Sequence, residues 1–118
     1  MKLIKLEKEA NMKVYIGKRK RSDVLVQIIE DGKTRELDAA PSQAIVNHSP
    51  DGFNWGYRGS GCAQLALAIL LDAIEDPNTA RTYYQDFKDI FVSGWDDHWA
   101  MPEVAIRNWL ANEMLREN

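Results

Sequence analysis

The chain has 118 residues, and its composition, with 45% hydrophobic and 28% charged residues, is that of an ordinary globular protein. A domain of this length can bury a core without a metal or disulfides, and the sequence contains no 18-residue apolar run that would span a membrane. Its single cysteine, Cys62, excludes an internal disulfide, so we expect a cytoplasmic protein.

The net charge of −3 is unevenly distributed along the chain. Residues 1–22 carry a net charge of +6, whereas residues 23–118 carry −9. Such an asymmetry can mark a basic arm for an acidic partner, although a solvated face that only aids solubility is the commoner explanation. Residues 1–12 are predicted to be an extension that precedes the domain.

The first part of the domain, residues 13–57, has the pattern of β-strands. Five segments rich in β-branched and aromatic residues predict strands: 13–18, 23–29, 33–37, 43–47 and 53–57. Asp31-Gly32 is a strong hairpin signal between the second and third of them. Pro50 and Gly52 predict a turn between the last two.

The second part, residues 61–116, has the pattern of helices. Residues 61–75 are apolar almost all round and predict a central buried helix that Pro77 ends. A second helix is predicted from a cap at Asn78 or Thr79 to about Val92, and a third begins at Pro102. Strands followed by helices favour a single α+β domain, with an antiparallel sheet of four or five strands packed against three helices.

The turn before the central helix is a candidate ligand site. Small residues at a helix N-terminus leave backbone N–H groups accessible, and the positive end of the helix dipole attracts anions. A phosphate or carboxylate is therefore expected near five residues: Asn54, Arg58, Gly59, Ser60 and Gly61. The spacing matches neither the dinucleotide-binding fingerprint nor the P-loop. The commoner explanation for such glycines is a tight turn in which Ser60 or Gly61 caps the helix.

Three aromatic residues alternate in the segment before this turn. On a strand, Phe53, Trp55 and Tyr57 would share one face, where they could either stack on bases or pack in the core. Because the next helix is so apolar, we expect them to face the core. Asn54 and Arg58 would then face the opposite way.

His48 and Cys62 are the candidates for catalysis. A thiol at a helix N-terminus ionises more readily, and a histidine could act as its base. The chain is short for a cysteine hydrolase and has no further signature of one, so we expect no catalytic residue. The Asp96-Asp97-His98 segment has no recognised metal-ligand spacing, and no metal or cofactor is expected.

Four consecutive basic residues, Lys18, Arg19, Lys20 and Arg21, join the first two predicted strands. A hairpin tip with this charge could contact the phosphates of a nucleic acid or another polyanion. A solvated, charged turn is the simpler alternative.

Residues 48–70, HSPDGFNWGYRGSGCAQLALAIL, are the most distinctive part of the chain. With YIGKR at residues 15–19, they resemble a family of small domains of unknown function associated with bacteria, archaea and mobile genetic elements. The resemblance covers most of residues 13–112 and implies one compact domain without an established activity. In that family Pro often stands where this chain has Cys62, which argues against a nucleophile at this position.

These observations favour a non-enzymatic binding or interaction domain that engages a protein, a nucleic acid or a small anionic ligand. The resemblance implies a phage- or plasmid-linked setting. A small nucleotide-ligand binder that uses the Arg58–Cys62 turn is the alternative, followed by a hydrolase with His48 and Cys62. The identity of the partner and the oligomeric state, a homodimer included, stay open, and no membrane contact is expected.

Overall fold

The computed structural model describes residues 13–117, so the expected extension at residues 1–12 lies outside the described residues. The α+β class is confirmed. In chain order the elements are β1 (Val14–Lys20), β2 (Asp23–Glu30), β3 (Lys33–Glu36), α2 (Ala40–Ile45), α3 (Ser60–Ile74), α4 (Pro77–Ile90), the 3₁₀ helix η1 (Val92–Gly94), β4 (His98–Pro102) and α5 (Glu103–Arg116).

The sheet has four antiparallel strands in the order β3-β2-β1-β4. Two hairpins join the first three strands. Asp31 and Gly32 both have positive φ angles, 55° and 76°, as the predicted hairpin turn between β2 and β3 requires. The fourth strand was not predicted, because it comes from residues 98–102, between η1 and α5. There it pairs with β1 and forms the second edge of the sheet.

Two of the predicted strands are wrong. Residues 43–47 lie in and just after α2, because the Asp38 side chain accepts a hydrogen bond from the Ala40 N–H and Pro41 fits the first helical turn. Residues 53–57 form an irregular segment in which Gly56 has a φ angle of +89°. Trp55 is fully buried, but Tyr57 is 49% exposed, so the three aromatic residues do not share a core face.

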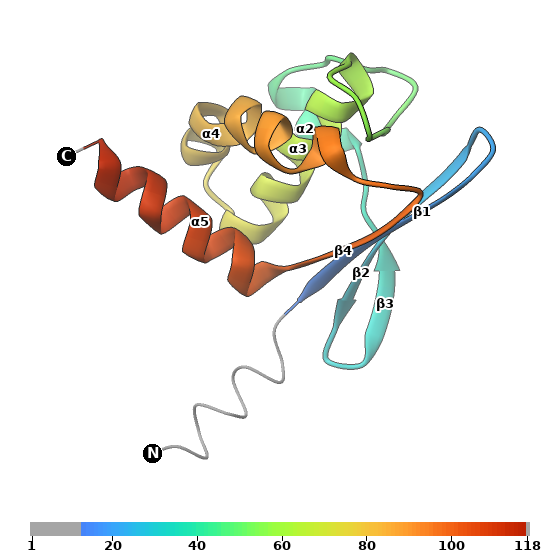
Figure 1. Cartoon of the computed structure of the whole chain (residues 1–118), viewed down its shortest axis with the longest axis horizontal. Coiled ribbons are helices and arrows are strands. Elements are labelled where there is room, and N and C mark those ends of the chain that lie inside the picture. The colour runs from blue at the N-terminus through green and yellow to red at the C-terminus, as the bar shows by residue number, and fades with distance from the viewer. Residues whose placement is uncertain (1–12, 118) are drawn as a thin grey trace.

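Helix α3 is the centre of the core, as predicted. Ten of its residues are buried, and Leu67 and Leu70 are fully so. The described helices lie on one side of the sheet, and α3 packs against α4, α2 and α5 (Figure 1). Glu75 ends α3 in a left-handed conformation, and Asp76 caps α4, with its side chain accepting hydrogen bonds from Asn78 and Thr79. The predicted cap at Asn78 or Thr79 is therefore wrong by two or three residues.

Gly17 in β1 permits a close packing of aromatic rings on the inner side of the sheet. A Cβ atom at this position would lie 2.2 Å from the Trp99 ring. Trp99 in turn stacks on Trp95 at a centroid distance of 3.9 Å and meets Trp55 edge to face at 5.6 Å. This cluster fixes the segment around Trp55 against the sheet. Among residues 13–117, no helix is long and apolar enough to cross a membrane.

Candidate functional site

His48 and Cys62, the two candidates for catalysis, have different surroundings in the structure. Cys62 is fully buried within the first turn of α3. The His48 ring lies against Tyr84, and its Nε2 is 2.6 Å from the tyrosine hydroxyl oxygen. No hydrogen bond joins His48 to the Cys62 sulfur, and His48 therefore serves to pack its segment against α4.

Gln64, which the sequence analysis passed over, holds the segment that carries His48. It is fully buried in α3. Its Oε1 accepts hydrogen bonds from the backbone N–H groups of His48 (2.7 Å) and Ser49 (3.0 Å). Its Nε2 donates to the Ser42 hydroxyl and to the Val46 carbonyl oxygen. A lone amide in an otherwise apolar helix was the signal that could have identified this residue.

The predicted anion site is only partly assembled. A hollow of about 460 Å³ lies at the start of α3 and includes Asn54, Ser60 and Gly61 in its lining. Arg58 does not line it; its side chain is 71% exposed and lies 3.7 Å from the carboxylate of Asp89. The ring of Tyr57 covers Gly59, since a Cβ atom there would be 2.3 Å from it.

Two acceptors further reduce the suitability of this hollow for an anion. The carboxylate of Asp51 belongs to its lining. The Oδ1 atom of Asn54 accepts hydrogen bonds from Arg19 (2.8 Å) and from the Trp55 N–H (2.9 Å). The N-terminus of α3 thus lacks the cationic donor that the sequence analysis assigned to it.

The basic run divides into one structural residue and three exposed ones. Arg19 contacts Asn54 and the carbonyl oxygen of Trp55, pairs with Asp97 at 3.1 Å, and lies over the Trp55 ring. Lys18, Lys20 and Arg21 are exposed on the β1–β2 hairpin, which projects from the body of the domain (Figure 1). These three residues form the accessible basic tip.

No described helix covers the second side of the sheet, which we call the outer face. Strand alternation and register place on it Val14, Ile16, Lys18, Lys20, Asp23, Leu25, Gln27, Ile29, Thr34, Glu36, His98, Ala100 and Pro102. Leu25 and Ile29 are each 37% exposed. The outer face therefore combines an apolar centre with a mainly basic end at the hairpin, where Asp23 lies opposite Lys20, and with Glu36 at the β3 edge.

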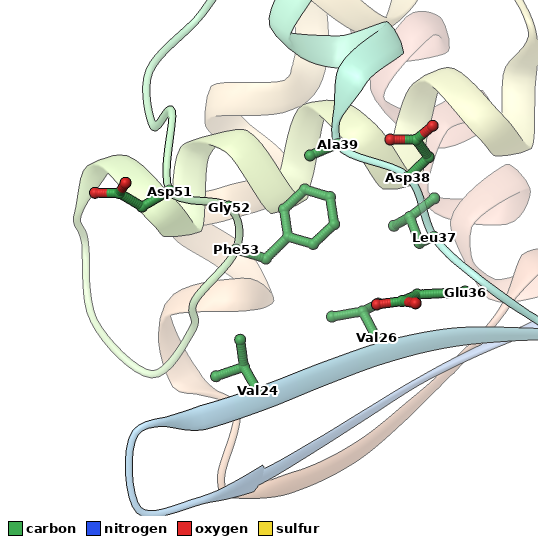
Figure 2. Close-up of a pocket in the computed structure, with 9 residues that line it drawn as sticks. All are labelled: Val24, Val26, Glu36, Leu37, Asp38, Ala39, Asp51, Gly52 and Phe53. Atoms are coloured by element: carbon green, nitrogen blue, oxygen red, sulfur yellow. The ribbon is translucent and has the colours of Figure 1, made fainter.

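A pocket of about 550 Å³ opens along β2, and we call it the groove. Its lining consists of Val24, Val26, Glu36, Leu37, Asp38, Ala39, Asp51, Gly52 and Phe53. Val24 and Val26 point up from the strand, and the Phe53 ring lies above them on the side of Ala39 (Figure 2). The groove forms because the chain leaves the sheet after Leu37 and turns into α2.

A model of a known protein family matches residues 15–112, which is most of the chain. The chain belongs to the family of unknown function DUF6166. No curated protein and no solved structure shows a significant match. The DUF6166 match includes the basic tip, the groove and α3, so all the candidate sites lie within the family domain, except Val14 at the margin of the outer face.

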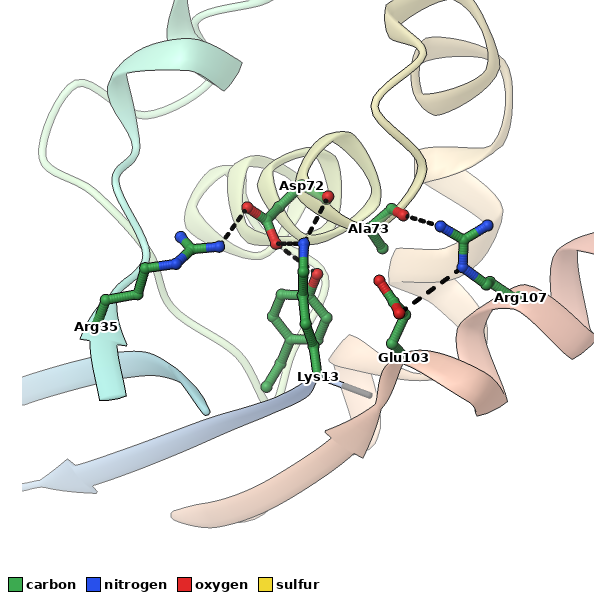
Figure 3. Close-up of polar contacts among 7 residues, drawn as sticks. Lys13, Arg35, Asp72, Ala73, Glu103 and Arg107 are labelled. Atoms are coloured by element: carbon green, nitrogen blue, oxygen red, sulfur yellow. Dashed lines mark hydrogen bonds and ion pairs between the residues drawn. The ribbon is translucent and has the colours of Figure 1, made fainter. Parts of the chain in front are cut away.

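In this DUF6166 domain a polar cluster surrounds Asp72 and joins α3 to the sheet (Figure 3). The Asp72 carboxylate accepts hydrogen bonds from the Tyr15 hydroxyl (2.6 Å) and from Lys13 and Arg35 (3.2 Å each). Burial alone would raise the pKa of Asp72, but these hydrogen bonds and the charge of Lys13 outweigh it and hold the pKa below its usual range. Burial and the bond to Asp72 raise the pKa of Tyr15.

We interpret this cluster as a structural link, because each donor to Asp72 comes from the sheet or the residue next to it. We expect Asp72→Asn to destabilise the domain by about 1.5–3 kcal/mol near neutral pH, since charged hydrogen bonds are lost. A depressed pKa contributes stability above the unfolded pKa of about 3.9 and loses it as the pH falls below that value. Urea unfolding across pH 2–7 should show this acid loss in the wild type and its reduction in Asp72→Asn. Equal pH profiles would contradict this interpretation.

Proposed function

We propose that this protein is a cytoplasmic, non-enzymatic interaction domain whose protein partner packs on the outer face of the sheet. One observation carries the proposal: the helices within residues 13–117 cover a single side of a four-stranded sheet, and the opposite side presents apolar side chains. Antiparallel sheets often leave one face to solvent, but that face is then usually polar. An apolar centre on such a face indicates a surface for contact.

The charge of the outer face supports a partner with an acidic rim. Lys18 lies opposite both Leu25 and His98 in the register, and Lys20 and Arg21 continue the basic end. Complementary charge at the rim of an interface directs the encounter, while the apolar centre supplies most of the affinity. The partner is therefore expected to present apolar residues bordered by Asp and Glu.

The arrangement of the reactive residues supports a binding function over catalysis. Cys62 is buried, and His48 is engaged by Tyr84. Among residues 13–117, no group of three or more His, Cys, Asp or Glu residues is placed to hold a metal ion. We further propose a phage- or plasmid-linked setting, which rests only on the resemblance of residues 15–19 and 48–70 described in the sequence analysis.

The test is to isolate the tagged chain from cells that naturally produce it and to measure the mass of the native complex. Leu25→Glu places a negative charge in the centre of the outer face, and we expect it to abolish the complex. Leu115→Glu is the matched control, because Leu115 is 71% exposed on α5, on the helical side. Retention of the partner by Leu25→Glu, or its loss in Leu115→Glu, would contradict the proposal.

A nucleic acid is the second candidate partner, on the strength of the exposed basic tip. In that case the wild type should bind duplex DNA at low salt. The double variant Lys20→Glu with Arg21→Glu should bind more weakly, and its binding should depend less on salt. Absence of binding by the wild type at low salt would exclude it.

A further inference from the structure

The first half of β2 has an open hydrogen-bonding edge. Successive residues of a strand direct their backbone groups to alternate neighbours. The hydrogen bond from Arg19 N–H to Asp97 O shows that the backbone groups of the odd-numbered residues of β1 point towards β4. The backbone groups of the even-numbered residues therefore point towards β2. In the β1–β2 register those residues pair with the odd-numbered residues of β2. Val24 and Val26 therefore direct their backbone groups away from β1.

Among the described residues, no strand lies next to this edge beyond Leu37. β3 pairs with residues 27–30 of β2, and the Leu37 N–H donates to the Val26 carbonyl oxygen. After that bond the chain turns away into α2. The N–H groups of Val24 and Val26 and the carbonyl oxygen of Val24 have no hydrogen-bond partner within residues 13–117.

The groove lies at this same edge. Val24 and Val26 of β2 belong to its lining, and Figure 2 shows both side chains on the strand that borders it. Val24, Val26 and Phe53 supply apolar contacts for one side chain of an incoming strand. Open backbone groups beside an apolar pocket are the features by which sheets accept an added peptide strand.

The charges around the groove define the chemistry of its occupant. Three acidic residues, Glu36, Asp38 and Asp51, belong to the lining, and no Lys or Arg does; Asp38 and Asp51 direct their carboxylates away from the apolar side chains, towards the rim (Figure 2). Asp38 accepts a bond from Ala40 N–H, whereas Glu36 and Asp51 have no ion-pair or hydrogen-bond partner in the described part of the chain. A basic side chain is the complement of such a rim.

We propose that the groove binds an extended peptide of a partner protein, which adds a short strand beside Val24–Val26. An apolar side chain of the peptide enters under Phe53, and a flanking Lys or Arg pairs with Glu36 or Asp51. The groove lies at the edge of β2 on the helical side of the sheet and shares only Glu36 with the outer face. Failure of one proposal therefore leaves the other intact.

The test uses the full chain and a short acetylated, amidated peptide of alternating Lys and Val. Amide hydrogen exchange by NMR should slow about tenfold or more at Val24 and Val26 when peptide is saturating, because both amides become hydrogen-bonded. Leu25 should change little, since its N–H faces β1 already. The same peptide with Glu in place of Lys should not bind.

Two sets of variants separate the backbone contacts from the charges. Val24→Pro removes a donor at the edge and should abolish peptide binding, whereas Thr34→Pro should retain it, because Thr34 directs its N–H away from β2 on the outer edge of β3. Glu36→Gln with Asp51→Asn should weaken binding about three- to tenfold, as expected for exposed ion pairs. Asp86→Asn, on α4, is the charge control and should not affect it.

Several results would overturn the proposal. The Lys-Val peptide could fail to bind, or bind without slowing exchange at Val24 and Val26. Equal binding of the Glu-Val peptide would show that the acidic residues of the groove do not select a basic peptide. Protection of both amides before any peptide is added would show that this chain or a second copy already occupies the edge.

Discussion

Gln64→Leu is expected to destabilise the domain by about 2–5 kcal/mol, although it replaces a polar side chain by an apolar one of similar size in an apolar helix. The substitution leaves the N–H groups of His48 and Ser49 without their acceptor and Val46 O and the Ser42 hydroxyl without their donor. Each unsatisfied buried group costs about 1–3 kcal/mol, and relaxation of the loop towards water recovers part of that.

Urea unfolding measures this effect, and Gln43→Leu is the matched control. Gln43 is half-buried and makes one side-chain hydrogen bond, from Nε2 to the carbonyl oxygen of Ser49. Its loss should cost about 0.5–1.5 kcal/mol. If the two variants were equally stable, Gln64 would not be the residue that holds this loop to α3.

Leu70→Ala should cost about 2–5 kcal/mol, because truncation of a fully buried leucine removes apolar contacts and leaves a cavity. The same range applies to Leu67→Ala. A domain is typically stable by about 5–15 kcal/mol, so either variant should show a marked fall in melting temperature. Leu115→Ala, at an exposed position, should change the free energy of unfolding by less than about 0.5 kcal/mol. A small effect at Leu70 would place α3 at a surface.

The elements that the sequence predicted well are those with local causes. Asp31-Gly32 determines its hairpin through the φ angles that the turn requires. Residues 61–75 are apolar on all sides, which suits a helix with neighbours all round. By contrast, β4 forms because residues 98–102 pair with β1, which lies some eighty positions earlier in the chain. The segment is short and contains Pro102, so its local pattern did not indicate a strand.

The candidate sites were harder to predict, because each depends on contacts between distant segments. Arg19 looked like its basic neighbours, yet Asn54, Trp55 and Asp97 engage its guanidinium. Residues 53–57 were predicted to alternate between two faces as in a strand, but the positive φ angle of Gly56 interrupts that alternation. The direction predicted for the Arg58 side chain rested on the same alternation. The groove exists only because the chain leaves the sheet after Leu37, which no local pattern indicates.

The most direct test of the account asks which surface of the chain the partner touches. A photoreactive amino acid would replace Ala100 on the outer face, Arg81 on α4, or Arg58 at the turn before α3, all of which are exposed. In cells that naturally produce the chain, we predict a protein crosslink from position 100 and none from positions 81 and 58. A crosslink from position 58 without one from position 100 would contradict the account and return the function to the start of α3.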